Sequence, residues 1–229
     1  MKKILKEAFL KSLPVMAGYI VLGFGFGIIA QKNGYGVLWV LAMSTFIYAG
    51  SMQYVAVSLL TSGATLIATA LTTLMVNARH LFYGISMIEP YKEAGKLKPY
   101  LIFGLTDETY SLVCSGEAPQ GVDFHKYSFF LSLLNQSYWI TGSVLGALAG
   151  SVLTFNCAGV DFAMTALFIT VFVEQWKSTH NHIPAMIGIS SSILCLLIFG
   201  SEHFLIPSML LISALLSFFR KVIEKKGDL

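Results

Sequence analysis

Charged residues are scarce in this chain. Only 12% of its 229 residues are Asp, Glu, Lys or Arg, whereas a soluble domain usually carries about 25%. Hydrophobic residues make up 55% of the chain, and no long polar stretch separates one apolar run from the next. This composition excludes an ordinary soluble domain and predicts a protein that is embedded in a lipid bilayer.

Cysteine is also rare, and the usual catalytic motifs are missing. Cys114, Cys157 and Cys195 are an odd number without metal-ligand spacing, so we expect inert thiols and no disulfide framework, metal or cofactor. The motifs G-x-S-x-G and H-E-x-x-H are absent, so nothing indicates an intramembrane hydrolase. His180 and His182 form an H-x-H pair, which we interpret as part of a solvated loop because further ligands are lacking.

The apolar runs are continuous and lack the alternation of barrel strands, so helices are expected to cross the membrane. We predict an all-α, polytopic transmembrane bundle of about seven segments, within six to eight, in a single domain over residues 1–229. The candidate segments are Val15–Ala30, Val37–Leu60, Thr65–Ile88, Tyr127–Leu153, Val160–Trp176, Pro184–Phe199 and Phe204–Phe219, with Tyr100–Cys114 as a weaker one.

Positive residues cluster beside these segments rather than along a binding face. The clusters lie at Lys2–Lys11, at Lys92–Lys98 and at Arg220–Lys226. Because Lys and Arg mark cytoplasmic loops, both termini are predicted to be cytoplasmic, and nucleic acid is not an expected partner. The Lys-rich start resembles a signal peptide, but no good cleavage site follows, so we expect an uncleaved first helix.

The second segment, Val37–Leu60, is the candidate for an interrupted helix. If every early segment crossed fully, the Lys92–Lys98 cluster would face outside, against the positive-inside rule. The centre of this segment contains Gly50, Ser51 and Gln53, which weaken a helix or are costly in lipid. The sequence leaves two alternatives open: a broken or re-entrant helix near Gly50, or a continuous helix whose polar residues face a neighbouring one.

Glycines recur at helical spacing in two places. Gly142, Gly146 and Gly150 form two overlapping G-x-x-x-G steps, and Gly23 and Gly27 form another. Small residues at this spacing let two membrane helices approach closely. A packing role is predicted, either within the chain or against a partner.

Ionisable side chains inside apolar sequence are the main functional signal, because burying a charge in lipid is costly. Arg79 and the acids Asp107 and Glu108 lie in two separate segments, so Arg79 is expected to hold an acid from another helix. The same interpretation assigns substrate-binding or proton-coupling roles to a larger set: Gly50, Ser51, Gln53, Asn77, Arg79, His80, Thr106, Asp107, Glu108, Asn135 and Gln136.

Structural alternatives remain for these residues. A pair between Arg79 and Asp107 or Glu108 can also serve only to tie helices together. His80 shares a helix face with Asn77 and Gly84 by its spacing. It is either a proton carrier or an ordinary hydrogen-bonded residue.

Several stretches of the first half resemble a known family. They are Ser12-Leu13-Pro14 with the following Gly-Phe-Gly-Phe-Gly run, Ile47–Gln53, Asn77–Gly84 and Phe103–Glu108. In their order and spacing they are similar to the AzlC-type large subunit of bacterial branched-chain amino-acid exporters. At Asn77, relatives of this type often carry Asp.

The resemblance implies a secondary transporter in the bacterial cytoplasmic membrane. It would export large aliphatic amino acids such as valine, leucine and isoleucine, with proton coupling, together with a small membrane subunit of the AzlD type. The residues allow an alternative of another class, a membrane-embedded enzyme or a channel subunit that acts on another small solute.

Overall fold

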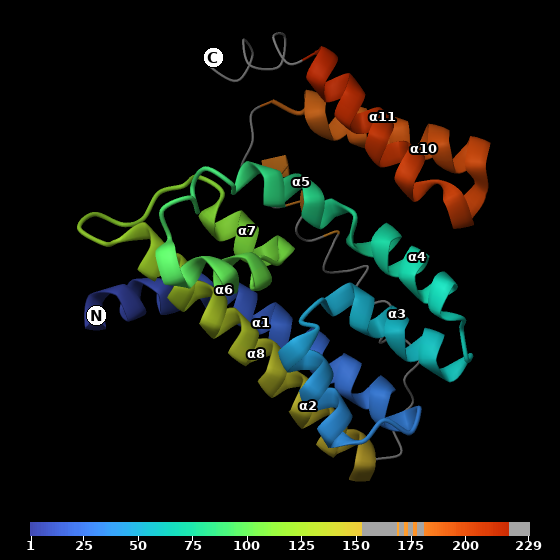
Figure 1. Ribbon diagram of the computed structural model, residues 1–229, viewed down its shortest axis with the longest axis horizontal. Coiled ribbons are helices and arrows are strands. Elements are labelled where there is room, and N and C mark those ends of the chain that lie inside the picture. The colour runs from blue at the N-terminus through green and yellow to red at the C-terminus, as the bar shows by residue number, and fades with distance from the viewer. Residues whose placement is uncertain (153–168, 170–171, 174–175, 178–180, 220–229) are drawn as a thin grey trace. The chain divides into compact units, whose positions relative to one another are not determined.

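The computed structural model describes residues 1–152, 169, 172–173, 176–177 and 181–219. The chain divides into two compact units, Met1–Met164 and Thr165–Leu229. Helices are the only regular secondary structure among the described residues (Figure 1). The all-α prediction is therefore confirmed.

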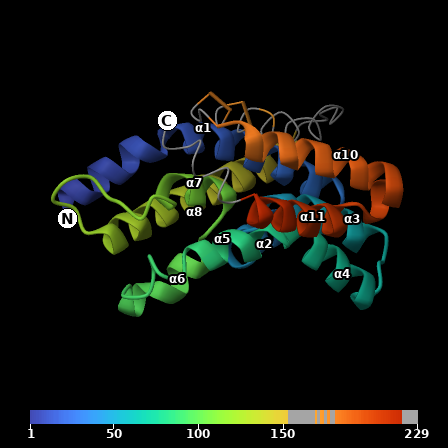
Figure 2. The same ribbon diagram turned by 90° about the horizontal axis from the view of Figure 1, so that it is seen from above.

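Two long helices, α1 (Lys2–Lys32) and α8 (Phe124–Val152), form the centre of the first unit and lie side by side in both views (Figures 1 and 2). Their glycines face each other at the seam. A Cβ added to Gly27 would lie 2.0 Å from the Ser143 carbonyl oxygen, and one added to Gly146 would lie 2.0 Å from the Phe24 carbonyl oxygen. The glycine series therefore packs helices within the chain, which settles the alternative that the sequence left open.

The second predicted segment is interrupted. Three residues, 47–49, separate helix α2 (Val37–Phe46) from helix α3 (Gly50–Thr61). Between them Tyr48 adopts φ +44°, a left-handed conformation that a bulky residue rarely takes and that a helix cannot continue through. Of the two alternatives that the sequence left open, the structure therefore has the broken helix.

Two further segments are also divided into short helices. The third predicted segment contains α4 (Leu66–Asn77) and α5 (Arg79–Ser86), which meet at Ala78. After the short 3₁₀ helix η1 (Gly95–Leu97), helix α6 (Lys98–Phe103) and helix α7 (Asp107–Val113) flank a break at 104–106. A break leaves the N–H groups at the start of the second helix without helical acceptors. At α7 the Thr106 side chain accepts one of them, the Thr109 N–H, whereas α3 and α5 have no side-chain cap.

The second unit contains α10 (Ile183–His203) and α11 (Leu205–Phe218), which pack against each other. Helix α10 changes direction at Gly200, which has φ +73°. These helices fall on the last two predicted segments. Most of Val160–Trp176, the cluster at Arg220–Lys226, and the residues Cys157 and His180 lie outside the described residues.

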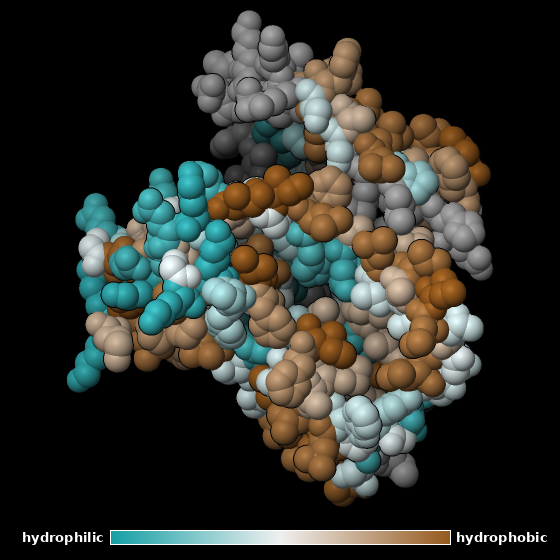
Figure 3. All heavy atoms as spheres, viewed as in Figure 1, coloured by the Kyte–Doolittle hydropathy of each residue, from teal (hydrophilic) through white to brown (hydrophobic). Residues whose placement is uncertain are grey.

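Two described helices, Lys2–Lys32 and Ile183–Ser201, are long and apolar enough to cross a bilayer by themselves. Elsewhere large apolar side chains are exposed, for example Leu66 at 88% and Leu38 at 80%. Brown, hydrophobic residues accordingly cover much of the face in Figure 3. Polar residues such as Gln53 and Asn135 are fully buried instead. This distribution, apolar outside and polar inside, is typical of a helical membrane protein.

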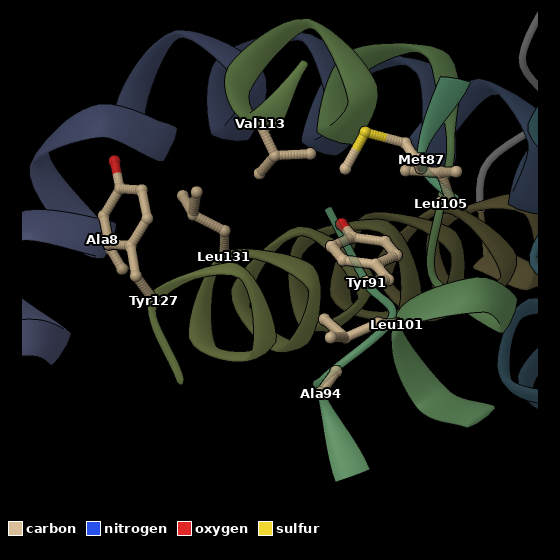
Figure 4. Packing of buried hydrophobic residues seen from close by; sticks show 9 residues of the cluster. All are labelled: Ala8, Met87, Tyr91, Ala94, Leu101, Leu105, Val113, Tyr127 and Leu131. Atoms are coloured by element: carbon tan, nitrogen blue, oxygen red, sulfur yellow. The ribbon is translucent and has the colours of Figure 1, made fainter. Parts of the chain in front are cut away.

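One end of the first unit has a compact apolar core (Figure 4). It fixes α6 and α7 against α1 and α8, and so positions the break at 104–106 that lies between the two short helices. Its buried members are Ala8, Met87, Tyr91, Ala94, Leu101, Leu105, Val113, Tyr127 and Leu131.

Candidate functional site

The first residues of three short helices meet at one point of the first unit. Arg79, at the start of α5, donates from Nη2 to the Ser51 hydroxyl of α3 at 2.9 Å. The same nitrogen lies 3.0 Å from Asp107 Oδ2 at the start of α7. Three interrupted segments are thus joined through one guanidinium. We call Ser51, Arg79 and Asp107 the charged junction.

Asp107 has a partner for each of its carboxylate oxygens. Oδ2 pairs with Arg79, and Oδ1 accepts a hydrogen bond from the Tyr83 hydroxyl, one turn further along α5. The Asp107 and Arg79 side chains are still 26% and 33% exposed. The ion pair is therefore not fully enclosed by the residues of the first unit. The predicted pairing of Arg79 with an acid from another helix is present, and Asp107 rather than Glu108 is that acid.

The start of α3 adds backbone donors beside the junction. Its N-cap residue, Ala49, offers no side-chain acceptor, and the first helical hydrogen bond comes from the Gln53 N–H to the Ala49 carbonyl. The N–H groups of Gly50 and Ser51 therefore have no acceptor within the helix. Such a helix start favours an anion. Gly50 also packs on the Trp139 ring, which a Cβ there would approach to 3.2 Å.

A second polar network lies next to the junction and extends to α1 and α8. The Tyr19 hydroxyl lies 2.6 Å from Glu108 Oε2 and 2.7 Å from Thr106 Oγ1. Thr106 Oγ1 lies 3.0 Å from Thr109 Oγ1, which accepts from Asn135 Nδ2 at 3.0 Å. Thr106, Thr109 and Asn135 are buried. The hydrogen-bonded series of five residues is called the hydroxyl chain: Glu108, Tyr19, Thr106, Thr109 and Asn135.

Gln53 connects the interrupted segment to α8. Its Nε2 donates to the Ser44 hydroxyl at 3.3 Å, and its Oε1 accepts from Trp139 Nε1 at 2.9 Å. The side chain is fully buried and both ends of the amide are used. Gln53 was predicted as a site residue. Its two hydrogen bonds brace the break near Gly50, and its predicted role at the site stays a prediction.

Gln136 has a similar position on α8. Its Oε1 accepts from the Tyr100 hydroxyl at 2.6 Å, and its Nε2 donates to the Thr45 carbonyl at 3.0 Å. That carbonyl belongs to the last turn of α2, where helical partners are missing. Gln136 therefore caps the end of α2 and holds it against α8 and α6.

A largely apolar pocket of about 280 Å³ is lined by neighbours of the charged junction in sequence, His80 beside Arg79 and Leu105 two residues before Asp107. Most of its wall is apolar, and His80, Tyr91 and Lys98 add polar groups. The apolar part comes from Gly84, Met87, Ile88, Ile102 and Leu105. This is somewhat below the usual volume of small-molecule pockets, about 300–1,000 Å³. The pocket can hold a small aliphatic group.

His80 and Gly84 line this pocket together, as their shared face suggested, but Asn77 does not. The helix is interrupted at Ala78, and Asn77 instead contributes its carbonyl oxygen, 3.2 Å from His80 Nδ1. His80 therefore has a hydrogen bond to backbone, and its ring packs against Tyr83 at 5.1 Å between centroids. Both of its predicted roles remain predictions.

Three tyrosines at the site were not predicted from the sequence: Tyr19, Tyr48 and Tyr83. Tyr83 shares a helix face with Arg79, four residues away, and that spacing is the one signal that pointed to it. Tyr19 lies in an apolar run with no such signal. Among the described residues no group of three or more His, Cys, Asp or Glu is placed to hold a metal ion.

Residues 14–153 match the family model described as AzlC protein. The chain is also 43% identical over 220 residues to the Branched-chain amino acid transport protein AzlC of Bacillus subtilis, covering 96% of this chain and 87% of that one. The chain belongs to the AzlC family. The match extends well beyond the stretches between Ser12 and Glu108 that carried the resemblance in the sequence.

Other relatives of this AzlC-family protein are named as membrane proteins. A Helicobacter pylori protein, named only as an uncharacterized membrane protein, is 41% identical over 222 residues and 97% of both chains. The Inner membrane protein YgaZ of Escherichia coli is 30% identical over 173 residues, covering 72% of this chain and 71% of that one. No solved structure gives a significant match. Membership and composition together establish a membrane protein of a transport family.

Proposed function

We propose that this protein is a proton-coupled secondary transporter that exports branched-chain amino acids such as valine, leucine and isoleucine. The name of the Bacillus subtilis relative supports the substrate class. The observation that carries the proposal is the charged junction, where a cation and an anion from separate helices meet and whose sequence neighbours line a largely apolar pocket.

An aliphatic amino acid is a zwitterion, so it complements an ion pair. Its carboxylate can bind Arg79 and the N–H groups at the start of α3, while its ammonium binds Asp107. Without substrate, Arg79 and Asp107 neutralise each other at 3.0 Å. With substrate, two new pairs replace that one. The charges of Arg79 and Asp107 are therefore paired both with and without bound amino acid. A carrier needs this because it opens to one side of the membrane with substrate bound and returns without it.

The apolar pocket supplies the wall for the side chain of the substrate. Leu105 and His80, which line it, are close in sequence to Asp107 and Arg79. Each methylene that leaves water for such a pocket contributes about 0.8 kcal/mol. Leucine is thus favoured over alanine by its larger side chain.

The same proposal includes the cytoplasmic membrane, cytoplasmic termini and a small AzlD-type subunit as partner. The inner-membrane name of the Escherichia coli relative and the lysines at Lys2–Lys11 support the location and orientation. The exposed apolar helix faces can be covered by lipid and by a second membrane subunit alike.

Transport by purified protein tests the proposal. Liposomes that contain the protein, alone and with a co-expressed small subunit, are loaded with leucine and mixed with labelled leucine outside. We expect saturable entry of label by exchange, inhibited by valine and isoleucine but not by lysine. Chemically altered leucine in the vesicles would indicate an enzyme, and non-saturable entry a channel; either result would contradict the proposal.

The pocket gives a prediction for selectivity. Nothing lies within 4 Å of a Cβ added to Gly84, so Gly84→Val is tolerated sterically and narrows the pocket. We expect the preference for leucine over alanine to fall by about tenfold, the usual effect of lost hydrophobic fit. Competition by the two amino acids against labelled leucine measures this. Gly188→Val, which also has no neighbour within 4 Å, is the control and should keep the preference.

A further inference from the structure

The adjacent carboxylates Asp107 and Glu108 have different surroundings. Asp107 is paired with Arg79 and accepts from Tyr83. Glu108 accepts from the Tyr19 hydroxyl at 2.6 Å and has no ion-pair partner among the described residues. A carboxylate without a cation in a partly buried position can gain stability by binding a proton, which Asp107 cannot do without losing its ion pair.

Each hydroxyl group in the hydroxyl chain has only one hydrogen to donate, so the direction of its hydrogen bonds depends on whether Glu108 is protonated. The Tyr19 hydroxyl has one hydrogen and two oxygen neighbours, Glu108 Oε2 and Thr106 Oγ1. An ionised Glu108 can only accept, so Tyr19 then donates to it and Thr106 donates to Tyr19. A protonated Glu108 can donate to Tyr19, and Tyr19 then donates to Thr106, which donates to Thr109. One proton thus reverses the direction of successive hydrogen bonds.

Spare hydrogen-bonding groups lie at the other end of this chain. Asn135 Nδ2 already donates to Thr109 Oγ1, but Asn135 Oδ1 is fully buried without a hydrogen-bond partner. The buried Tyr48 hydroxyl also has no well-formed hydrogen bond, although it lies near Tyr19 and Thr106. Unpaired buried polar groups are rare and call for an explanation. Here they leave acceptors and donors available for either direction of the chain.

We propose that Glu108 carries the coupled proton and that Tyr19 transmits its protonation state to α1 and α8 through the hydroxyl chain, while Asp107 stays with Arg79 for the substrate. This inference rests on the proposed function. Glu108 binds a proton from water on one side of the membrane and releases it to water on the other. The charged and titratable groups around it are Tyr19 from α1, Tyr48 from the 47–49 link, Arg79 and Tyr83 from α5, and Asp107 from α7.

The test separates two kinds of transport by the reconstituted protein. Leucine exchange needs no net proton movement, whereas accumulation driven by an imposed pH gradient does. Glu108→Gln keeps the shape of the protonated side chain but cannot release a proton. We expect it to exchange leucine while its gradient-driven accumulation falls about tenfold or more, in the range of coupling between two sites. Glu89→Gln, at an exposed residue paired with Lys92, is the control and should keep both activities.

Tyr19→Phe is the second variant. It removes the hydroxyl group that links Glu108 to the rest of the hydroxyl chain and leaves the Glu108 carboxyl group in place. We expect exchange with a changed pH dependence of accumulation. Gradient-driven accumulation by Glu108→Gln at the wild-type level would overturn the proposal. So would loss of exchange in both variants while they elute as folded protein, since the chain would then serve binding or structure. Absence of leucine exchange by the unsubstituted protein would instead overturn the proposed function.

Discussion

Neutralising Arg79 alone or Asp107 alone abolishes leucine transport, and neutralising both does not restore it. This is the largest functional effect that we expect. Each single change, Arg79→Gln or Asp107→Asn, removes one partner of the zwitterion and leaves the other charge uncompensated. Loss of such a contact costs about 2–5 kcal/mol, a fall in affinity of roughly 30-fold or more.

The double variant separates substrate binding from a purely structural ion pair. Both side chains are a quarter to a third exposed, so each single change should lower stability by only about 1–2 kcal/mol. The double variant leaves neither Arg79 nor Asp107 as an unpaired charge and should recover most of that loss. If the pair only tied α5 to α7, transport would recover with stability.

Two measurements on the same preparations decide this point. Thermal unfolding in detergent reports stability, and leucine exchange in liposomes reports function. We expect the double variant to unfold near the wild-type temperature and to remain inactive. An active double variant would show that the ion pair is structural and that the amino acid binds elsewhere.

The sequence predicted the members of this site better than their arrangement. Arg79 and the two acids were recognisable because charges are rare in apolar sequence. The sequence did not show whether Asp107 or Glu108 pairs with Arg79. Neighbouring residues on a helix project about 100° apart, so the packing of α7 decides which of the two faces Arg79. Asp107 meets Arg79 and Glu108 meets Tyr19 for this reason.

The roles of other residues could not be predicted, because their partners lie far away in the sequence. Tyr19 is 89 positions from Glu108, and a tyrosine in an apolar helix is common enough to carry no signal by itself. Gln53 and Gln136 were assigned to the site as polar residues in apolar segments, and the structure shows that they also brace the breaks in the helices; their part in substrate binding stays a prediction. A polar residue inside a bundle therefore indicates a partner, and the fold decides whether that partner is protein or solute.

Backbone features were easier to predict, since they follow from residue size and conformation. The interruption near Gly50 was visible as a Gly-Ser step in an apolar run, although the left-handed residue is Tyr48. The glycine series predicted close helix contact, and the α1–α8 seam realises it. The number of membrane crossings stays a prediction, because divided segments such as α2 and α3 can either cross or return.

The seam gives the largest expected effect on stability. A single methyl group at Gly27 would lie 2.0 Å from the Ser143 carbonyl oxygen and 2.5 Å from the Ala147 amide nitrogen. Both are backbone atoms of a helix, so neither can move aside without separating α1 from α8. Overpacking of this kind costs about 1–3 kcal/mol and sometimes more. We expect Gly27→Ala to fall at or above the upper end of that range.

Gly188→Ala is a matched control, because it makes the same change inside helix α10 where no atom lies within 4 Å of the new Cβ. Alanine is a better helix former than glycine by about 1 kcal/mol, so this variant should be as stable as the unsubstituted protein or slightly more so. For Gly27→Ala, a loss of 3 kcal/mol lowers the unfolding temperature by about 6–12 °C in a chain of this size. Thermal unfolding of both variants in the same detergent gives the comparison. Equal unfolding temperatures would mean that α1 and α8 do not pack through their glycines, and the position of Tyr19 beside Glu108 would lose its support.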